Sequence, residues 1–191
     1  MIKRTVEFLF EAGMLKKTPR TGYQFLGSGS ESVAEHSFRT TILGYVLATM
    51  EKGADIDKTV RMCLFHDLPE ARTGDHNYVN KKYVTVHEEK AILEQTKDLP
   101  FGDDIVNLTH EFNAATSLEA RIAKDADQLD LILELKGHHD SGNPNAKKWL
   151  AYALKRLCTE SGKTIGREIM SSKSDGWWFD DDEDWWVNGR K

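Results

Sequence analysis

Two histidines and two aspartates stand where the surrounding sequence predicts burial. His36 lies in a stretch with apolar residues on both faces, and the pair His66-Asp67 closes a second apolar stretch. The run IAKDADQLDL supplies the other aspartate. Asp125 and Asp127 lie on different faces of one helix, and helix geometry alone does not decide which of them is the ligand. A buried carboxylate without a partner is costly. Side chains of these types remove that cost by sharing a divalent cation, and imidazole with carboxylate suits Mn, Fe, Co, Ni or Zn.

Helices have to position these side chains, because almost the whole chain shows a helical spacing of apolar residues and no stretch shows sustained strand alternation. Ser32 with Glu35, and Thr116 with Glu119, form capping boxes that predict helix starts. The predicted helices cover about residues 2–14, 33–50, 57–68, 84–97, 102–113, 117–137 and 144–159. The sequence therefore predicts an all-α fold, with a loop rich in Gly and Ser over residues 16–31.

The predicted helix at residues 33–50 carries apolar residues on two sides. One side includes Phe38 and Ile42, and the side beneath the first histidine includes Leu43 and Leu47. A helix with two apolar faces is typical of the middle of a fold. We therefore expect this helix to be covered all round.

Composition and charge limit the class of protein. The chain of 191 residues corresponds to about one domain, and its net charge of -5 gives no general attraction to nucleic acid or anionic membranes. No apolar stretch reaches the ~20 residues of a membrane span, and the N-terminus lacks a signal-peptide pattern. Cys63 and Cys158 lie in apolar helical patterns that are typical of buried free thiols. These features predict a cytoplasmic protein that binds neither nucleic acid nor membrane.

The last stretch of the chain differs in character from the rest. All but one of the five tryptophans lie there, beside a block of acids at residues 180–184. Such a charge run alone would be disordered, but the tryptophans predict that part of it docks on its own domain or on a second subunit, or recruits a partner. We therefore divide the chain into a main domain at residues 1–172 and a C-terminal arm at residues 173–191.

The order of the candidate ligands along the chain is more specific than any one of them. His36, then His66-Asp67, then Asp127, each in a predicted helix, resembles the H…HD…D motif of the HD-domain superfamily of metal-dependent phosphohydrolases. The resemblance extends over most of the chain. It implies an HD-domain helical bundle with a buried divalent-metal site, in which Asp127 rather than Asp125 is the fourth ligand.

A narrower similarity connects the chain to the 5′-deoxynucleotidase branch of that superfamily. The matching segments are PRTGY from Pro19, ESVAEHS from Glu31, HDLPEARTGD from His66 and EARIAKDAD from Glu119. The similarity implies single-metal hydrolysis of (deoxy)nucleoside 5′-monophosphates to nucleoside and phosphate, by a homodimer. The chain departs from the branch in residues 76–84, which by the same similarity should border the base and the sugar.

The resemblance also implies roles for side chains around the metal. Arg20 falls where the family places an arginine near the substrate phosphate, and a guanidinium grips phosphate in a two-pronged way. Glu70 and Asp75 are the two candidates for proton transfer. Lys82, or its neighbour Lys81, could balance the charge of the phosphate.

Other functions are compatible with the same metal ligands. An HD-type phosphodiesterase or a nucleoside polyphosphate hydrolase would keep the metal and cleave a different bond. A nucleotide-binding regulatory protein with little turnover would keep the site and use the arm for recruitment. Glu70 and Asp75 argue against the regulator, because a pure binder needs no group for proton transfer.

Overall fold

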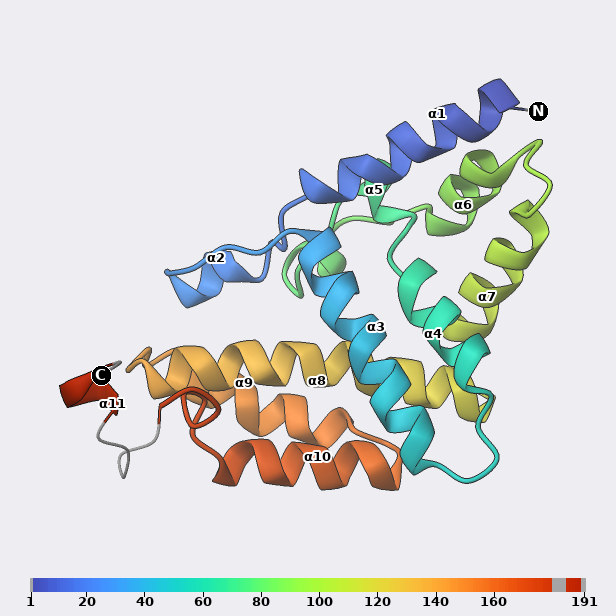
Figure 1. Ribbon diagram of the computed structural model, residues 1–191. Coiled ribbons are helices and arrows are strands. Elements are labelled where there is room, and N and C mark those ends of the chain that lie inside the picture. The colour runs from blue at the N-terminus through green and yellow to red at the C-terminus, as the bar shows by residue number, and fades with distance from the viewer. Residues whose placement is uncertain (1, 180–184, 190–191) are drawn as a thin grey trace.

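The computed structural model describes residues 2–179 and 185–189, and over these residues the protein is all-α, as the sequence predicts (Figure 1). The elements are α1 (Ile2–Ala12), η1 (Gly13–Lys16), α2 (Tyr23–Leu26), α3 (Val33–Met50), α4 (Ile56–Phe65), α5 (Glu70–Thr73), η2 (Asn80–Lys82), α6 (Glu88–Thr96), α7 (Gly102–Ala114), α8 (Leu118–Asp140), α9 (Ala146–Ala153), η3 (Leu154–Arg156), α10 (Glu160–Ser171) and α11 (Trp185–Asn188). The described residues contain no strand, and an isolated bridge pairs Pro19 with Ser32. None of the described helices is long and apolar enough to cross a membrane.

The core forms where α3, α4 and α8 pack against one another (Figure 1). α8 spans 23 residues, and α7, α9 and α10 also lie against it. Leu47, Met62, Ile122 and Leu129 are fully buried where these helices meet. A second cluster, which includes Val33, joins α1 and α6 to the start of α3. The packing therefore brings the start of α3, the end of α4 and the middle of α8 together.

The predicted helix starts are right at one position and shifted at another. The capping box of α3 is confirmed, because the Ser32 side chain accepts from the backbone N–H of Glu35 and the Glu35 carboxylate accepts from that of Ser32. The box of Thr116 with Glu119 is wrong. Ser117 caps α8, and the Glu119 carboxylate instead accepts a hydrogen bond from the backbone just before α4. The competing partner is on another helix, which a local motif cannot reveal.

The expectation that α3 is covered all round is wrong. The side with His36 and Leu47 is buried against α4 and α8. The opposite side is open, with Phe38 70% exposed, Ile42 49% and Val46 38%. The physical reason is that the described chain provides neighbours for only one side of this helix, so an apolar face remains on the surface.

Two other elements differ from the expectation. α4 ends at Phe65, and the residues from His66 to Pro69 form turns before α5 begins at Glu70. The helix α10 was not predicted, although its Thr159 side chain caps it by accepting from a backbone N–H. Cys63 is buried as expected, but Cys158 is exposed just before α10, because the chain turns there.

The C-terminal arm is described in part. Its start is tied to α8, since Lys136 donates to the carbonyl of Ser172 and Asp140 accepts from the backbone of Ser174. Trp178, Phe179 and Trp186 pack against one another and stay partly exposed. The acidic block at residues 180–184 lies outside the described residues, and the boundary after residue 172 stays a prediction.

Candidate metal centre

Three nitrogen and oxygen atoms converge where α3 meets the end of α4. His36 Nε2 lies 3.3 Å from His66 Nε2 and 3.4 Å from Asp67 Oδ2, and the last two atoms are 3.2 Å apart. From α8, Asp127 Oδ1 lies 3.3 Å from the same nitrogen of His36. Both histidines are buried. The structure thus brings together four side chains that the sequence spreads over three helical regions.

Each histidine is oriented by a hydrogen bond on its other ring nitrogen. His66 Nδ1 is 2.7 Å from the carbonyl oxygen of Cys63, and His36 Nδ1 is 2.6 Å from Asp130 Oδ2. A carbonyl or carboxylate oxygen accepts, so each Nδ1 carries a proton and each Nε2 offers a lone pair. Two lone pairs facing each other at this distance require a proton or a cation between them.

The charge around this point favours a cation. Burial alone would lower the pKa of His36, but its hydrogen bonds with Asp127, Asp130 and Asp67 outweigh burial and raise the pKa above its ordinary value. Carboxylates that attract a proton to this nitrogen also attract a metal ion. His36, His66 and Asp67 offer ligand atoms that all lie within 4.8 Å of one another, which fits a divalent metal, and Asp127 approaches the same His36 nitrogen from α8. Imidazole with carboxylate suits Mn, Fe, Co, Ni or Zn.

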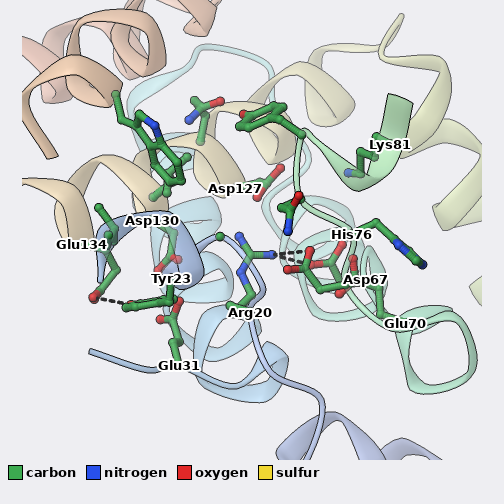
Figure 2. Close-up of a pocket in the computed structure, with 18 residues that line it drawn as sticks. Arg20, Tyr23, Glu31, Asp67, Glu70, His76, Lys81, Asp127, Asp130 and Glu134 are labelled. Carbon is green, nitrogen blue, oxygen red and sulfur yellow. Dashed lines mark hydrogen bonds and ion pairs between the residues drawn. The ribbon is translucent and has the colours of Figure 1, made fainter. Parts of the chain in front are cut away.

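The geometry separates Asp125 from Asp127. The Asp125 carboxylate is buried and accepts hydrogen bonds from the backbone N–H groups of Cys158 and Thr159 and from the Thr159 hydroxyl, at 2.9, 2.7 and 2.6 Å. It is therefore committed to the start of α10. Asp127 instead lines the cleft that contains Asp67 (Figure 2). The arrangement supports Asp127 as the fourth ligand.

The two proton-transfer candidates both line this cleft but differ in their surroundings. Asp75 is held by its neighbours, because its Oδ2 accepts from the backbone N–H and the hydroxyl of Thr21 at 2.6 and 3.0 Å. Glu70 Oε2 is buried without a hydrogen-bond partner among the described residues. Burial, followed by the charges of Asp67 and Asp75, raises the pKa of Glu70 to about 9. Glu70 Oε2 is thus a buried oxygen that a bound ligand would satisfy, whereas Asp75 Oδ2 already accepts from Thr21.

Arg20 is the cation nearest to the metal centre along the described cleft wall. Its Nη1 lies 3.5 Å from Asp67 Oδ2 and 4.0 Å from Asp75 Oδ1 (Figure 2). Its backbone N–H donates to the carbonyl of Glu31, beside the Pro19 bridge, which fixes the loop that carries it. A guanidinium held among these carboxylates is well placed to receive an anion that enters the cleft.

The lining of the cleft favours Lys81 over Lys82, the lysine chosen from the sequence, and the role of either one stays a prediction. Lys81 lines the cleft and Lys82 does not (Figure 2). The two residues follow each other in the short 3₁₀ helix η2, in which successive side chains point in different directions. The sequence offered no means of choosing between neighbours in such a turn.

Sequence reasoning missed a side chain that supports the centre. Asp130 is fully buried and lies between His36 and Arg39, whose Nε donates to its Oδ1 at 2.5 Å. The Arg39 guanidinium also pairs with Glu134 at 2.6 Å. A sequence signal existed, because Asp130 follows Asp127 by three residues and so shares its side of the helix.

Comparison with known proteins places this geometry in a family. A family model described as HD domain matches residues 12–169. The chain belongs to the HD-domain family. It is 30% identical to the 5′-deoxynucleotidase HDDC2 of Bos taurus over 74% of this chain and 71% of the relative. It is 34% identical to the 5′-deoxynucleotidase HDDC2 of Dictyostelium discoideum over 68% and 74%.

Solved structures show the same fold. A conserved hypothetical protein from Pyrococcus furiosus superposes with a TM-score of 0.74 at 30% identity, over 87% of this chain and 99% of that one. A protein of Magnetospirillum magnetotacticum MS-1, described as a predicted metal-dependent phosphohydrolase, has a TM-score of 0.68 at 25% identity, over 89% and 91%. The HD-domain bundle expected from the sequence is therefore confirmed.

Proposed function

We propose that this HD-domain protein is a metal-dependent 5′-nucleotidase that hydrolyses (deoxy)nucleoside 5′-monophosphates to nucleoside and phosphate. The observation that carries the proposal is that one cleft contains Asp67 and Asp127 of the metal centre together with Arg20 and the unpartnered Glu70. The names of the similar 5′-deoxynucleotidases support this substrate class.

His36, His66, Asp67 and Asp127 would hold one divalent metal, which is Mn, Co, Zn, Fe or Ni. A metal of this kind polarises a phosphoryl oxygen and lowers the pKa of a water molecule. Asp130 and the Cys63 carbonyl keep the two imidazoles in the orientation that this role needs.

The remaining side chains bind phosphate and move a proton. Arg20, which lies beside Asp67 and Asp75, grips the phosphoryl oxygens, and Lys81 balances their charge from the edge of the cleft. Glu70 handles the proton, because one of its oxygens is unpartnered and its raised pKa keeps it protonated near neutrality, so that it can donate a proton to the leaving 5′-oxygen. Asp75 holds the Arg20 loop in place through Thr21.

We also propose a cytoplasmic homodimer. The open face of α3 places Phe38, Ile42, Tyr45 and Val46 at helical spacing on one surface, and each is more than a third exposed. An exposed apolar helix face of this kind is typical of an interaction site. The free, buried thiol of Cys63 is typical of a reducing compartment. Light scattering on the purified protein and on Ile42→Lys tests the dimer, which the charge should break into monomers.

A substrate screen tests the proposed activity. The protein is stripped of metal, reloaded with Mn, Co or Zn, and assayed for free phosphate from nucleoside mono-, di- and triphosphates and for cleavage of cyclic dinucleotides. We expect phosphate from monophosphates, with the deoxy forms at least as good as the ribo forms. Preferred cleavage of polyphosphates or diesters would mean that the protein catalyses a different hydrolysis. No cleavage with any metal would contradict the proposed activity.

A further inference from the structure

One wall of the cleft has no role in the chemistry described above. Tyr78, Gln128 and Trp149 line the same cleft as Asp67 and Asp127, yet they lie in different elements: a loop, α8 and α9. Gln128 follows Asp127 directly in the chain, so this wall begins beside the metal centre. We call these three residues the aromatic wall.

The aromatic wall is held in place by contacts that leave room in the cleft. The rings of Tyr78 and Trp149 are perpendicular, with centroids 6.5 Å apart. Arg156 stacks 4.6 Å above the Tyr78 ring and donates to its hydroxyl, so it occupies one side of that ring. Phe25 packs edge-on against Trp149. A flat group that lies on one of the two wall rings would therefore meet the edge of the other.

The amide of Gln128 adds a polar group with a defined direction. Its Oε1 accepts from Arg156 Nη1 at 3.3 Å, and because a guanidinium only donates, the atom facing it has to be the oxygen. The Nε2 group is then the other end of the amide, and it is buried with no hydrogen-bond partner among the described residues. A buried donor without an acceptor is unfavourable, so a bound acceptor in this place would be stabilised.

We propose that the aromatic wall is the binding site of the nucleobase, which stacks on the ring of Tyr78 or Trp149 and accepts a hydrogen bond from Gln128 Nε2. This inference rests on the proposed 5′-nucleotidase function and adds its recognition element. An aromatic heterocycle fits because it offers both a flat face and a ring nitrogen or carbonyl oxygen at its edge. All four common bases carry such an acceptor, so the wall selects for the presence of a base rather than for one base.

The test compares a nucleotide with the same phosphate ester without its base. For the metal-loaded enzyme, kcat/KM is measured for 2′-deoxyadenosine 5′-monophosphate and for 2-deoxyribose 5-phosphate, and the ratio of the two values is the readout. We expect Tyr78→Leu and Trp149→Leu to lower this ratio about tenfold, because base–aromatic stacking is lost. Gln128→Leu should lower it about fivefold, because one hydrogen bond is lost.

A matched control is Tyr152→Leu, which changes an exposed aromatic of α9 that does not line the cleft, and it should leave the ratio unchanged. Thermal unfolding identifies a variant that fails to fold. Tyr78 is half-exposed, so we expect Tyr78→Leu to stay folded, and this variant tests the proposal if Trp149→Leu unfolds. Equal losses on both substrates, or an unchanged ratio in all three wall variants, would overturn the inference.

Binding of the free nucleoside separates this inference from the activity. Titration of 2′-deoxyadenosine into the wild type, followed by ligand-observed NMR, requires neither phosphate nor turnover. Binding that weakens in Gln128→Leu and Tyr78→Leu supports the proposed base-binding site even if no ester is cleaved. Absence of binding in the wild type, together with normal cleavage of deoxyribose 5-phosphate, would support the phosphatase activity and contradict the base-binding site.

Discussion

The metal centre and the aromatic wall share one cleft but are built differently. In the metal centre, His36 and Asp127 stand on long helices, and the two imidazoles are each fixed by a buried or backbone oxygen. In the aromatic wall, Tyr78 stands on a loop and Trp149 on a separate short helix, and both keep an exposed surface. The difference indicates that the centre is fixed by buried helices and hydrogen bonds, whereas the wall depends on ring contacts between a loop and a short helix at the surface.

The largest effect is expected at the centre itself. Asp67→Ala removes a proposed ligand, whose Oδ2 lies 3.4 Å from His36 Nε2, and also the partner of Arg20. We expect loss of the bound metal and a fall in kcat/KM of more than about a thousandfold, since metal activation is lost. Phosphate release and metal analysis of the same sample measure this. A variant that keeps both metal and turnover would contradict the ligand set.

The second prediction separates Glu70 from Asp75. Glu70→Gln should lower kcat about a hundredfold with little change in KM, because the proton-transfer group is lost and its shape is kept. Asp75→Asn should mainly raise KM, because its contacts with Thr21 and Arg20 position the phosphate-binding loop. Steady-state kinetics with a nucleoside monophosphate decides the matter, and the reverse pattern would exchange the two roles.

The third prediction concerns the side chain that orients His36. Asp130→Asn keeps the size of the residue but weakens its hydrogen bonds with His36 and Arg39. We expect the affinity for the metal to fall about 10- to 100-fold, as for other partners of metal-bound histidines. Competition with a chelator of known affinity measures this, and a wild-type affinity would mean that Asp130 only packs.

The smallest effect is expected at the open edge of the cleft. Lys81→Ala should raise KM for nucleoside monophosphates a few-fold, since an exposed charge contributes little. Lys82→Ala is the matched control and should behave as the wild type. The difference should shrink at high salt, because screening weakens exposed charges. A larger effect from Lys82 would restore the assignment made from sequence alone.

The sequence predicts the metal centre better than the aromatic wall for a physical reason. Amphipathic spacing and the capping box at Ser32 locate the helices, and His36 and Asp127 point where their own helices direct them, while His66 and Asp67 directly follow the end of α4. Tyr78, Gln128 and Trp149 are brought together only by the packing of α8, α9 and a loop, which no local pattern encodes. The same limit explains the open face of α3, because a local apolar pattern does not say which neighbour covers it.

The choice between Asp125 and Asp127 could be predicted from the sequence only in part. Their spacing placed them on different faces, but only the tertiary contact with Cys158 and Thr159 shows which face holds the start of α10. The unpredicted α10 is therefore the element that favours Asp127 over Asp125 as the fourth ligand. A missed helix and an open ligand choice have one cause, since both depend on the packing of residues far apart in the chain.

The pair of variants Asp127→Asn and Asp125→Asn tests the central claim most directly, with metal content and unfolding temperature measured on each. We predict that Asp127→Asn loses the metal and phosphate release yet stays folded. Asp125→Asn should keep both functions and lose about 2 kcal/mol of stability, because a buried carboxylate that accepts hydrogen bonds from Cys158 and Thr159 is replaced. Loss of metal from Asp125→Asn alone, with Asp127→Asn fully loaded and active, would contradict the account.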